Sequence, residues 1–142
     1  MLFLTHSDYS ALRAHGEETY PYECCGVLLG NAAPEGNRVR QIVRAGNTRT
    51  DRAHDRYHIA PEELIKIQRQ ARGLSLDIVG FYHSHPDHPP RPSKTDAALG
   101  WEVYTYLIVS VSRGAVLESR AWRFAPGADP REEAITITDH VS

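Results

Sequence analysis

Apolar residues recur at helical spacing in two segments of the chain. The first segment begins near Ser7 or Asp8, either of which can act as an N-cap, and extends to about Thr19. The second extends from Pro61 to Arg72, with proline at the first helical position and Gly73 just past the end. Two helices are therefore expected. The residues expected to face the core from the second helix are Leu64, Ile67 and Ala71.

Shorter apolar runs predict the strands of a sheet. Cys25–Leu29 has the composition of a buried strand, and Arg38–Ala45 alternates charged with apolar residues after a turn at Pro34–Asn37. This mixture of helices and strands predicts an α/β or α+β fold. Three later strands are expected near Tyr104–Val111, Val116–Phe124 and Ala134–Thr138.

The segment Asp77–Tyr82 is continuously apolar, as in a central strand covered on both faces. Simple alternation places Val79 and Phe81 on the face that also carries His83 and His85. The histidines therefore emerge where a buried strand leaves the core, which is where sites in open sheets are usually found.

Length, charge and cysteine content exclude several classes of protein. The 142 residues suit one domain, 1–142, and 16 Lys+Arg against 18 Asp+Glu give no basic field for nucleic acid. No apolar run reaches the roughly 18 residues of a membrane span, so no membrane partner is expected. The apolar start lacks the basic region of a signal peptide, and the adjacent Cys24 and Cys25 give no disulfide framework. A cytoplasmic location is expected.

The spacing H-x-H-x7-S-x-x-D, from His83 to Asp96, predicts a metal site. On a strand, His83 and His85 point the same way, with Cα atoms about 6.6 Å apart at roughly 3.3 Å per residue. Catalytic zinc takes three protein ligands and leaves a fourth position for water. Asp96 is the candidate for the third ligand.

Simpler interpretations of these residues stay open. Ser93 and Asp96 also form a capping box for a short helix that would run to about Gly100, and such a helix needs no metal. Four prolines between positions 86 and 92 would restrict the intervening loop, which favours a preorganised site. His88 is a candidate ligand or substrate contact, but it is expected to be an exposed histidine in the loop. Surface positions are also expected for His54 and His58.

A metal-dependent hydrolase also needs an acid/base group, and Glu23 is the candidate. It directly precedes the expected buried strand at Cys25–Leu29, where a carboxylate does not serve packing. The alternative is that Glu23 is a solvated turn residue, and the residues alone do not decide between the two.

The chain resembles the JAMM, or MPN-plus, metalloprotease family, and most closely its small free-standing prokaryotic members. The resemblance covers about residues 24–122 and implies a single MPN domain, with a central mixed sheet flanked by helices as in the cytidine-deaminase-like fold. The deaminase pattern itself, H-x-E with P-C-x-x-C, is absent. The segments that carry the resemblance are Glu23–Gly30, Tyr57–Leu64, Val79–Pro86 and Pro92–Asp96.

The resemblance implies a role for each of five residues. His83, His85 and Asp96 would bind Zn²⁺, and Glu23 would move a proton from the attacking water to the leaving amine. Ser93 would stabilise the oxyanion, a contact commonly worth about 3–4 kcal/mol. Ser84 alternates to the opposite face and is not expected to be catalytic.

The implied substrates are peptide or isopeptide bonds after the C-terminal glycines of ubiquitin-like proteins. For small prokaryotic members these are sulfur-carrier proteins whose C-terminal extension is removed. Their tail could lie as an added strand along a sheet edge. The sequence carries no signal for the oligomeric state.

Two hypotheses from other classes remain. Some relatives are non-catalytic MPN scaffolds, but these have typically lost ligands that this chain retains. A cysteine hydrolase using Cys24 or Cys25 is the other, although a buried cysteine before Gly26 suits core packing better. Dependence on metal separates these hypotheses from the metalloprotease.

Overall fold

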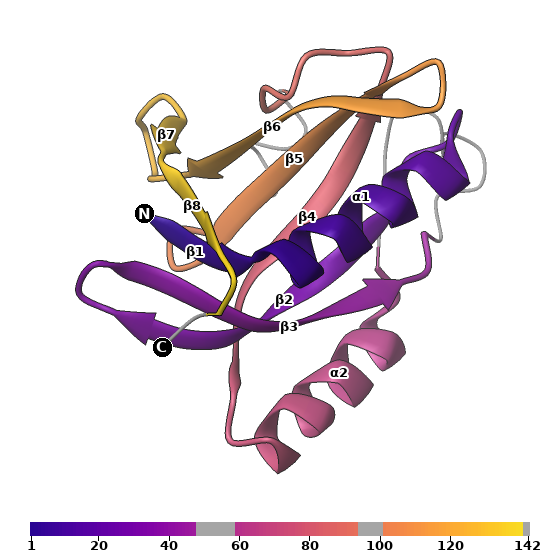
Figure 1. Cartoon of the computed structure of the whole chain (residues 1–142). Coiled ribbons are helices and arrows are strands. Elements are labelled where there is room, and N and C mark those ends of the chain that lie inside the picture. Colours follow the sequence, from indigo (N-terminus) through magenta and orange to yellow (C-terminus); the bar gives the residue numbers. More distant parts are fainter. Residues whose placement is uncertain (48–58, 94–100, 141–142) are drawn as a thin grey trace.

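The structure, a computed structural model, describes residues 1–47, 59–93 and 101–140 (Figure 1). Within these residues the chain forms eight strands and two helices. They are β1 (Leu2–Thr5), α1 (His6–Thr19), β2 (Cys25–Ala33), β3 (Gly36–Ala45), α2 (Pro61–Gly73), β4 (Asp77–Pro86), β5 (Thr105–Ser112), β6 (Ala115–Arg123), β7 (Arg131–Glu133) and β8 (Ile135–Thr138).

The strands form one mixed sheet in the order β7-β6-β5-β4-β2-β3-β1-β8. Strand β4 lies in its middle, antiparallel to β2 and parallel to β5. Strand β1 is parallel to both β3 and β8. The expected central mixed sheet flanked by helices is therefore confirmed.

A helix packs against each face of the sheet (Figure 1), and the two faces are here called the α1 face and the α2 face. On the α1 face, Leu12 of the helix joins a cluster that includes Leu28 of β2. On the α2 face, Ile67 of the helix joins Val27 and Leu29. Successive residues of β2 thus enter opposite cores, which explains why its sequence is continuously apolar.

Strand β1 is an element that the sequence pattern did not predict, and it changes the start of α1. Leu2 and Leu4 are fully buried in the core of the α1 face. The chain passes directly from β1 into the helix, so Thr5 becomes the N-cap and its hydroxyl accepts a hydrogen bond from the Asp8 amide at 3.0 Å. The prediction that Ser7 or Asp8 caps this helix is wrong.

A β-bulge in β4 changes which residues share a face. Leu28 pairs with Gly80 and the next residue, Leu29, pairs with Ile78. Val79 is therefore an extra residue without a partner in β2. Such a bulge reverses the alternation of side chains on one side of it.

Because of this bulge, Val79 packs on the α1 face with Tyr82, whereas Phe81 packs on the α2 face. The prediction that Val79 and Phe81 share a face is wrong. Alternation is regular beyond the bulge, so His83 and His85 still share the face of Phe81.

Several boundaries also differ from the sequence-based expectation. Strand β2 continues to Ala33, and β7 is an additional short strand before β8. The second helix, from Pro61, agrees with the prediction to within one residue. The expected helix after Asp96 lies outside the described residues. Neither described helix is long and apolar enough to cross a membrane.

Candidate metal centre

The C-terminal end of β4 carries two buried histidines on the α2 face. His83 pairs with Cys25, which belongs to the core of that face, and His85 follows two residues later. The exposed fraction is 1% for His83 and 9% for His85. The histidines therefore lie at the end of a central strand, as the sequence predicted.

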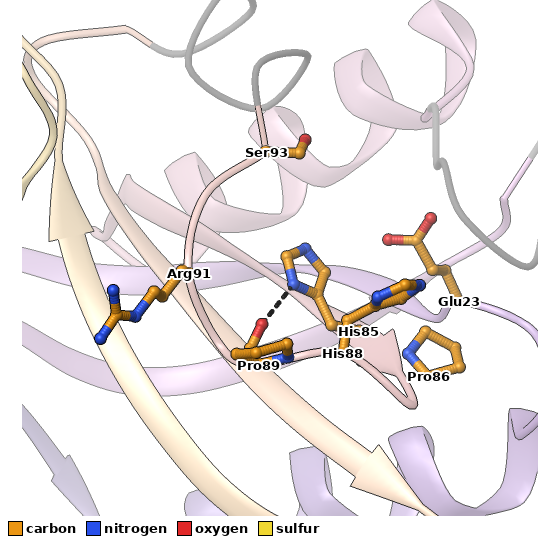
Figure 2. Close-up of a pocket in the computed structure, with 7 residues that line it drawn as sticks. All are labelled: Glu23, His85, Pro86, His88, Pro89, Arg91 and Ser93. Carbon is orange, nitrogen blue, oxygen red and sulfur yellow. Dashed lines mark hydrogen bonds between the residues drawn. The ribbon is translucent and has the colours of Figure 1, made fainter.

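The two imidazole rings converge on each other. Their Nε2 atoms are 3.1 Å apart. Nδ1 of His85 lies 2.9 Å from the carbonyl oxygen of Pro89 (dashed in Figure 2). Since a carbonyl oxygen can only accept, Nδ1 carries the proton, and in the neutral ring Nε2 keeps its lone pair for a metal. Histidine ligands are commonly oriented by a second group in this way.

Glu23 enters the same centre from the segment that precedes β2. Its carboxylate and the ring nitrogens of His83 and His85 all lie within 4.8 Å of one another. The Glu23 side chain is only 4% exposed, so the interpretation as a solvated turn residue is wrong. Within the described residues, these three form the one group of His, Cys, Asp or Glu with the spacing of a metal site. The structure therefore contains a possible metal site of two histidines and one carboxylate.

Hydrogen bonds at Glu23 and at the next residue, Cys24, hold the backbone there. The amide of Cys24 donates to Oγ of Ser84 at 2.8 Å, and the amide of Ser84 donates to the carbonyl of Cys24 at 3.2 Å. The side chain of Asn47 donates to the carbonyl of Glu23 at 3.4 Å. Ser84 thus binds backbone rather than the pocket, and Asn47 is a supporting residue that the sequence did not reveal.

The loop after β4 is tied to β5 and β6. The Asp87 amide donates to the Val111 carbonyl at 2.7 Å, and Ser110 Oγ donates to the His88 carbonyl. Nε1 of Trp122 donates to the Pro90 carbonyl at 2.9 Å. These bonds add to the restriction expected from the prolines, and they explain how the Pro89 carbonyl is held against His85.

A pocket of about 380 Å³ opens over the centre. Figure 2 shows the Glu23 carboxylate and the His85 ring pointing towards the side of the pocket where Ser93 lies. His88 lies in the exposed loop, as expected, and is not part of the metal-site trio. The pocket is lined by Glu23, His85, Pro86, His88, Pro89, Arg91 and Ser93.

The structure thus brings together four of the five predicted site residues, with Ser93 at the pocket and Glu23, His83 and His85 in the trio. Asp96, the fifth, lies outside the described residues. His54 and His58 do so as well.

Neither cysteine has the surroundings of a nucleophile. Both thiols are buried, with 2% exposure for Cys24 and 0% for Cys25. Burial raises the pKa of both thiols, which keeps them protonated near neutral pH. The thiol of Cys25 belongs to the apolar core of the α2 face. The cysteine-hydrolase hypothesis therefore finds no support in this geometry.

Comparison with known proteins relates the chain to peptidases. The family model described as prokaryotic homologs of the JAB domain matches residues 5–125. A CysO-cysteine peptidase of Mycobacterium tuberculosis is 31% identical over 131 residues, which cover 92% of this chain and 86% of that protein. A desampylase of Haloferax volcanii is 39% identical over 93 residues, and the match spans 63% of each protein.

The fold is also found in a solved structure. The solution structure of a Desulfitobacterium hafniense protein superposes with a TM-score of 0.87, covering 99% of this chain and 95% of that protein. Its sequence identity is 24%, so this likeness concerns the fold alone.

Proposed function

The chain belongs to the prokaryotic homologs of the JAB domain, and on that basis we propose that it is a zinc-dependent peptidase. It would hydrolyse the bond after the C-terminal glycines of a ubiquitin-like protein, foremost a sulfur carrier with a C-terminal extension. The observation that carries this proposal is the buried trio of Glu23, His83 and His85 beside a pocket. The names of its relatives, a CysO-cysteine peptidase and a desampylase, support the same class of substrate.

The nitrogen atoms of the two histidines fit a zinc ion. Two nitrogen ligands at about 2.0–2.1 Å from a tetrahedral ion are about 3.3 Å apart, close to the 3.1 Å between the Nε2 atoms of His83 and His85. We assign these two histidines as ligands, with Asp96 as the third. When bound, zinc supplies Lewis-acid polarisation of the carbonyl group and makes water a better nucleophile near neutral pH.

Glu23 is assigned to the proton transfers. Its buried carboxylate would accept a proton from the attacking water and donate it to the departing amine, a role that typically contributes 10²–10⁴-fold. The bonds of Cys24 to Ser84 and of Asn47 to Glu23 keep the carboxylate against the histidines. Ser93, at the pocket, is assigned to the oxyanion through its hydroxyl.

The sheet limits how a substrate tail can approach. Strand β4 is paired with β2 and β5, and the edges of the described sheet are β7 and β8. The tail therefore has no free edge of β4 beside His83, so a strand added to the described sheet would have to lie along β7 or β8. We propose instead that it enters through the pocket, where glycines allow close backbone approach to the centre.

Cleavage of a ubiquitin-like carrier with a short extension after its terminal glycines tests this function. The parent protein should cleave it with zinc and lose activity with a chelator. Glu23→Gln should lower kcat by about 10²–10⁴-fold while zinc content, measured by elemental analysis, stays at the parent level. Glu62→Gln, which changes an exposed carboxylate on α2, is the matched control and should stay active.

The same experiment separates the roles open to Glu23. If Glu23 were a ligand rather than the acid/base, Glu23→Gln would lose zinc together with activity. Cleavage by metal-free protein would contradict the proposal, and loss of that cleavage in Cys25→Ala would identify a thiol enzyme. Zinc binding without any cleavage would favour the non-catalytic scaffold.

A further inference from the structure

We infer that a hydrogen bond between Tyr20 and Asp87 positions Glu23 against His83 and His85. This inference rests on the proposed function, since it assigns Tyr20 and Asp87 as positioning residues of that peptidase. Neither residue belongs to the metal-site trio or to the lining of the pocket.

The bond joins the two segments that supply the site. The Tyr20 hydroxyl lies 2.8 Å from Oδ1 and 2.9 Å from Oδ2 of Asp87, so one phenol donates across both carboxylate oxygens. Tyr20 comes three residues before Glu23, and Asp87 comes two residues after His85. This exposed contact therefore connects the segment of the acid/base to the segment of a ligand, in addition to the buried bonds between Cys24 and Ser84.

Asp87 is a fixed anchor for this contact. Its amide donates to the Val111 carbonyl at 2.7 Å, which ties its backbone to β5. Its φ of 59° lies in the left-handed region, which Asp and Asn adopt more readily than most residues. Its neighbours Pro86 and His88 line the pocket with Glu23 (Figure 2).

The segment that carries Glu23 needs such an anchor. It bridges the end of α1 at Thr19 and the start of β2 at Cys25, and it has no helix or strand of its own. Beyond Glu23, the segment is held by the bonds between Cys24 and Ser84. Before Glu23, the Tyr20–Asp87 bond is the hydrogen bond that ties it to the loop of His85 within the described residues.

An exposed hydrogen bond adds little to global stability, because water replaces either partner at small cost. Its effect on a reaction can be larger, since a misplacement of about 1 Å can lower a rate by about 100-fold. The bond is therefore expected to affect turnover more than folding.

Tyr20→Phe removes the hydroxyl, which donates to Asp87 and also meets the backbone of Arg113, and tests the inference. We expect kcat on the carrier substrate to fall about tenfold, with KM within about twofold and with unchanged zinc content and melting temperature. Tyr22→Phe is the matched control, because Tyr22 precedes Glu23 directly in the sequence and its side chain is exposed. An unchanged kcat in Tyr20→Phe, or an equal fall in Tyr22→Phe, would overturn the inference.

Substitutions at Asp87 test the other partner. Asp87→Asn keeps an acceptor and tolerates the positive φ, so its kcat should stay within about threefold of the parent. Asp87→Gly suits the same φ but removes the acceptor, and its kcat should fall as far as that of Tyr20→Phe. The double variant should be no slower than the slower single variant, whereas additive losses would show that the two residues act separately.

A measurement without substrate keeps this inference distinct from the proposed function. Hydrogen exchange at the amides of Tyr22, Glu23 and Cys24 should be faster in Tyr20→Phe than in the parent and in Tyr22→Phe. If the parent cleaved no tail, the proposed function would fail, and this exchange would still decide whether the bond holds Glu23. Equal exchange in all three proteins would overturn the inference.

Discussion

The two faces of the sheet use neighbouring residues at the same strand ends for different purposes. On the α1 face, Cys24 and Ser84 are bonded to each other and lie under the helix, close to Gly16. On the α2 face, Glu23 and His83, one residue away from each, lie in the possible metal site beside a pocket. All four are buried, so burial alone does not distinguish residues that support the site from residues assigned to catalysis or metal binding. The face of the sheet on which a residue lies does distinguish them.

The largest expected effect comes from removing a residue of the α2 face. His83→Ala should abolish zinc binding and lower cleavage about a thousandfold, since metal-ion catalysis supplies several kcal/mol. Elemental analysis and steady-state kinetics measure the two effects. If this variant kept its zinc and its turnover but lost stability, His83 would be a packing residue, and the distinction between the two faces would be wrong.

Gly26→Ala probes packing on the α1 face. A Cβ at this position would collide with the Tyr82 ring, which lies directly over the glycine. Displacing this buried ring should cost about 3 kcal/mol of unfolding free energy, measured by urea denaturation. Gly73→Ala, at a site with no neighbour within 4 Å, is the control. An equal effect of the two substitutions would show that backbone freedom, rather than the ring, decides the cost.

The pH dependence of stability should also arise on the α1 face. Burial, and then Arg44, lowers the pKa of His15 from its ordinary 6.5 to about 4. Below pH 6.5 the folded protein therefore binds fewer protons than the unfolded chain, so stability is full above that pH and falls towards pH 4. The loss between pH 7 and pH 5 should be about 2 kcal/mol.

Urea denaturation of His15→Gln at both pH values isolates this contribution. The variant should lose the part of the pH dependence that comes from His15. It also loses the contact between the His15 ring and the Tyr82 hydroxyl at 2.7 Å, so the comparison uses the change in stability between the two pH values rather than the stability itself. Identical pH dependence in variant and parent would exclude His15 as its source.

The smallest expected effect comes from Ser84→Ala. The Cys24 amide would lose the hydroxyl that accepts its hydrogen bond, at a cost of about 1–2 kcal/mol in unfolding free energy. Zinc content should be unchanged, in contrast with His83→Ala one residue earlier. Loss of zinc in this variant would mean that the α1 face also takes part in metal binding.

Features encoded locally were predictable from the sequence. Helix α2 carries its own start and stop signals in Pro61 and Gly73, and the spacing of His83 and His85 follows from strand alternation. The resemblance to the JAMM family, read from its motifs, is confirmed by the match to the JAB family model. Asp96 as a ligand stays a prediction.

Features that depend on distant partners were not predictable. Strand β1 has four residues and forms because β3 and β8 flank it. The proximity of Glu23 to the histidines depends on the pairing of β2 with β4, about sixty residues apart, so only the family resemblance indicated it. The Pro89 carbonyl that orients His85 likewise owes its place to Trp122 and Ser110 in other strands.

The bulge at Val79 has a consequence for altering the length of this protein. At this position β4 has one residue more than the strand β2 opposite it, because Val79 has no partner there. Deleting Val79 should leave Ile78 opposite Leu29 and both histidines on their face, at the cost of one buried side chain. An insertion between His83 and His85 would instead send one histidine to the wrong face. The metal-site geometry is therefore expected to survive a change of length at Val79, but not a change of length four residues later, at the histidines.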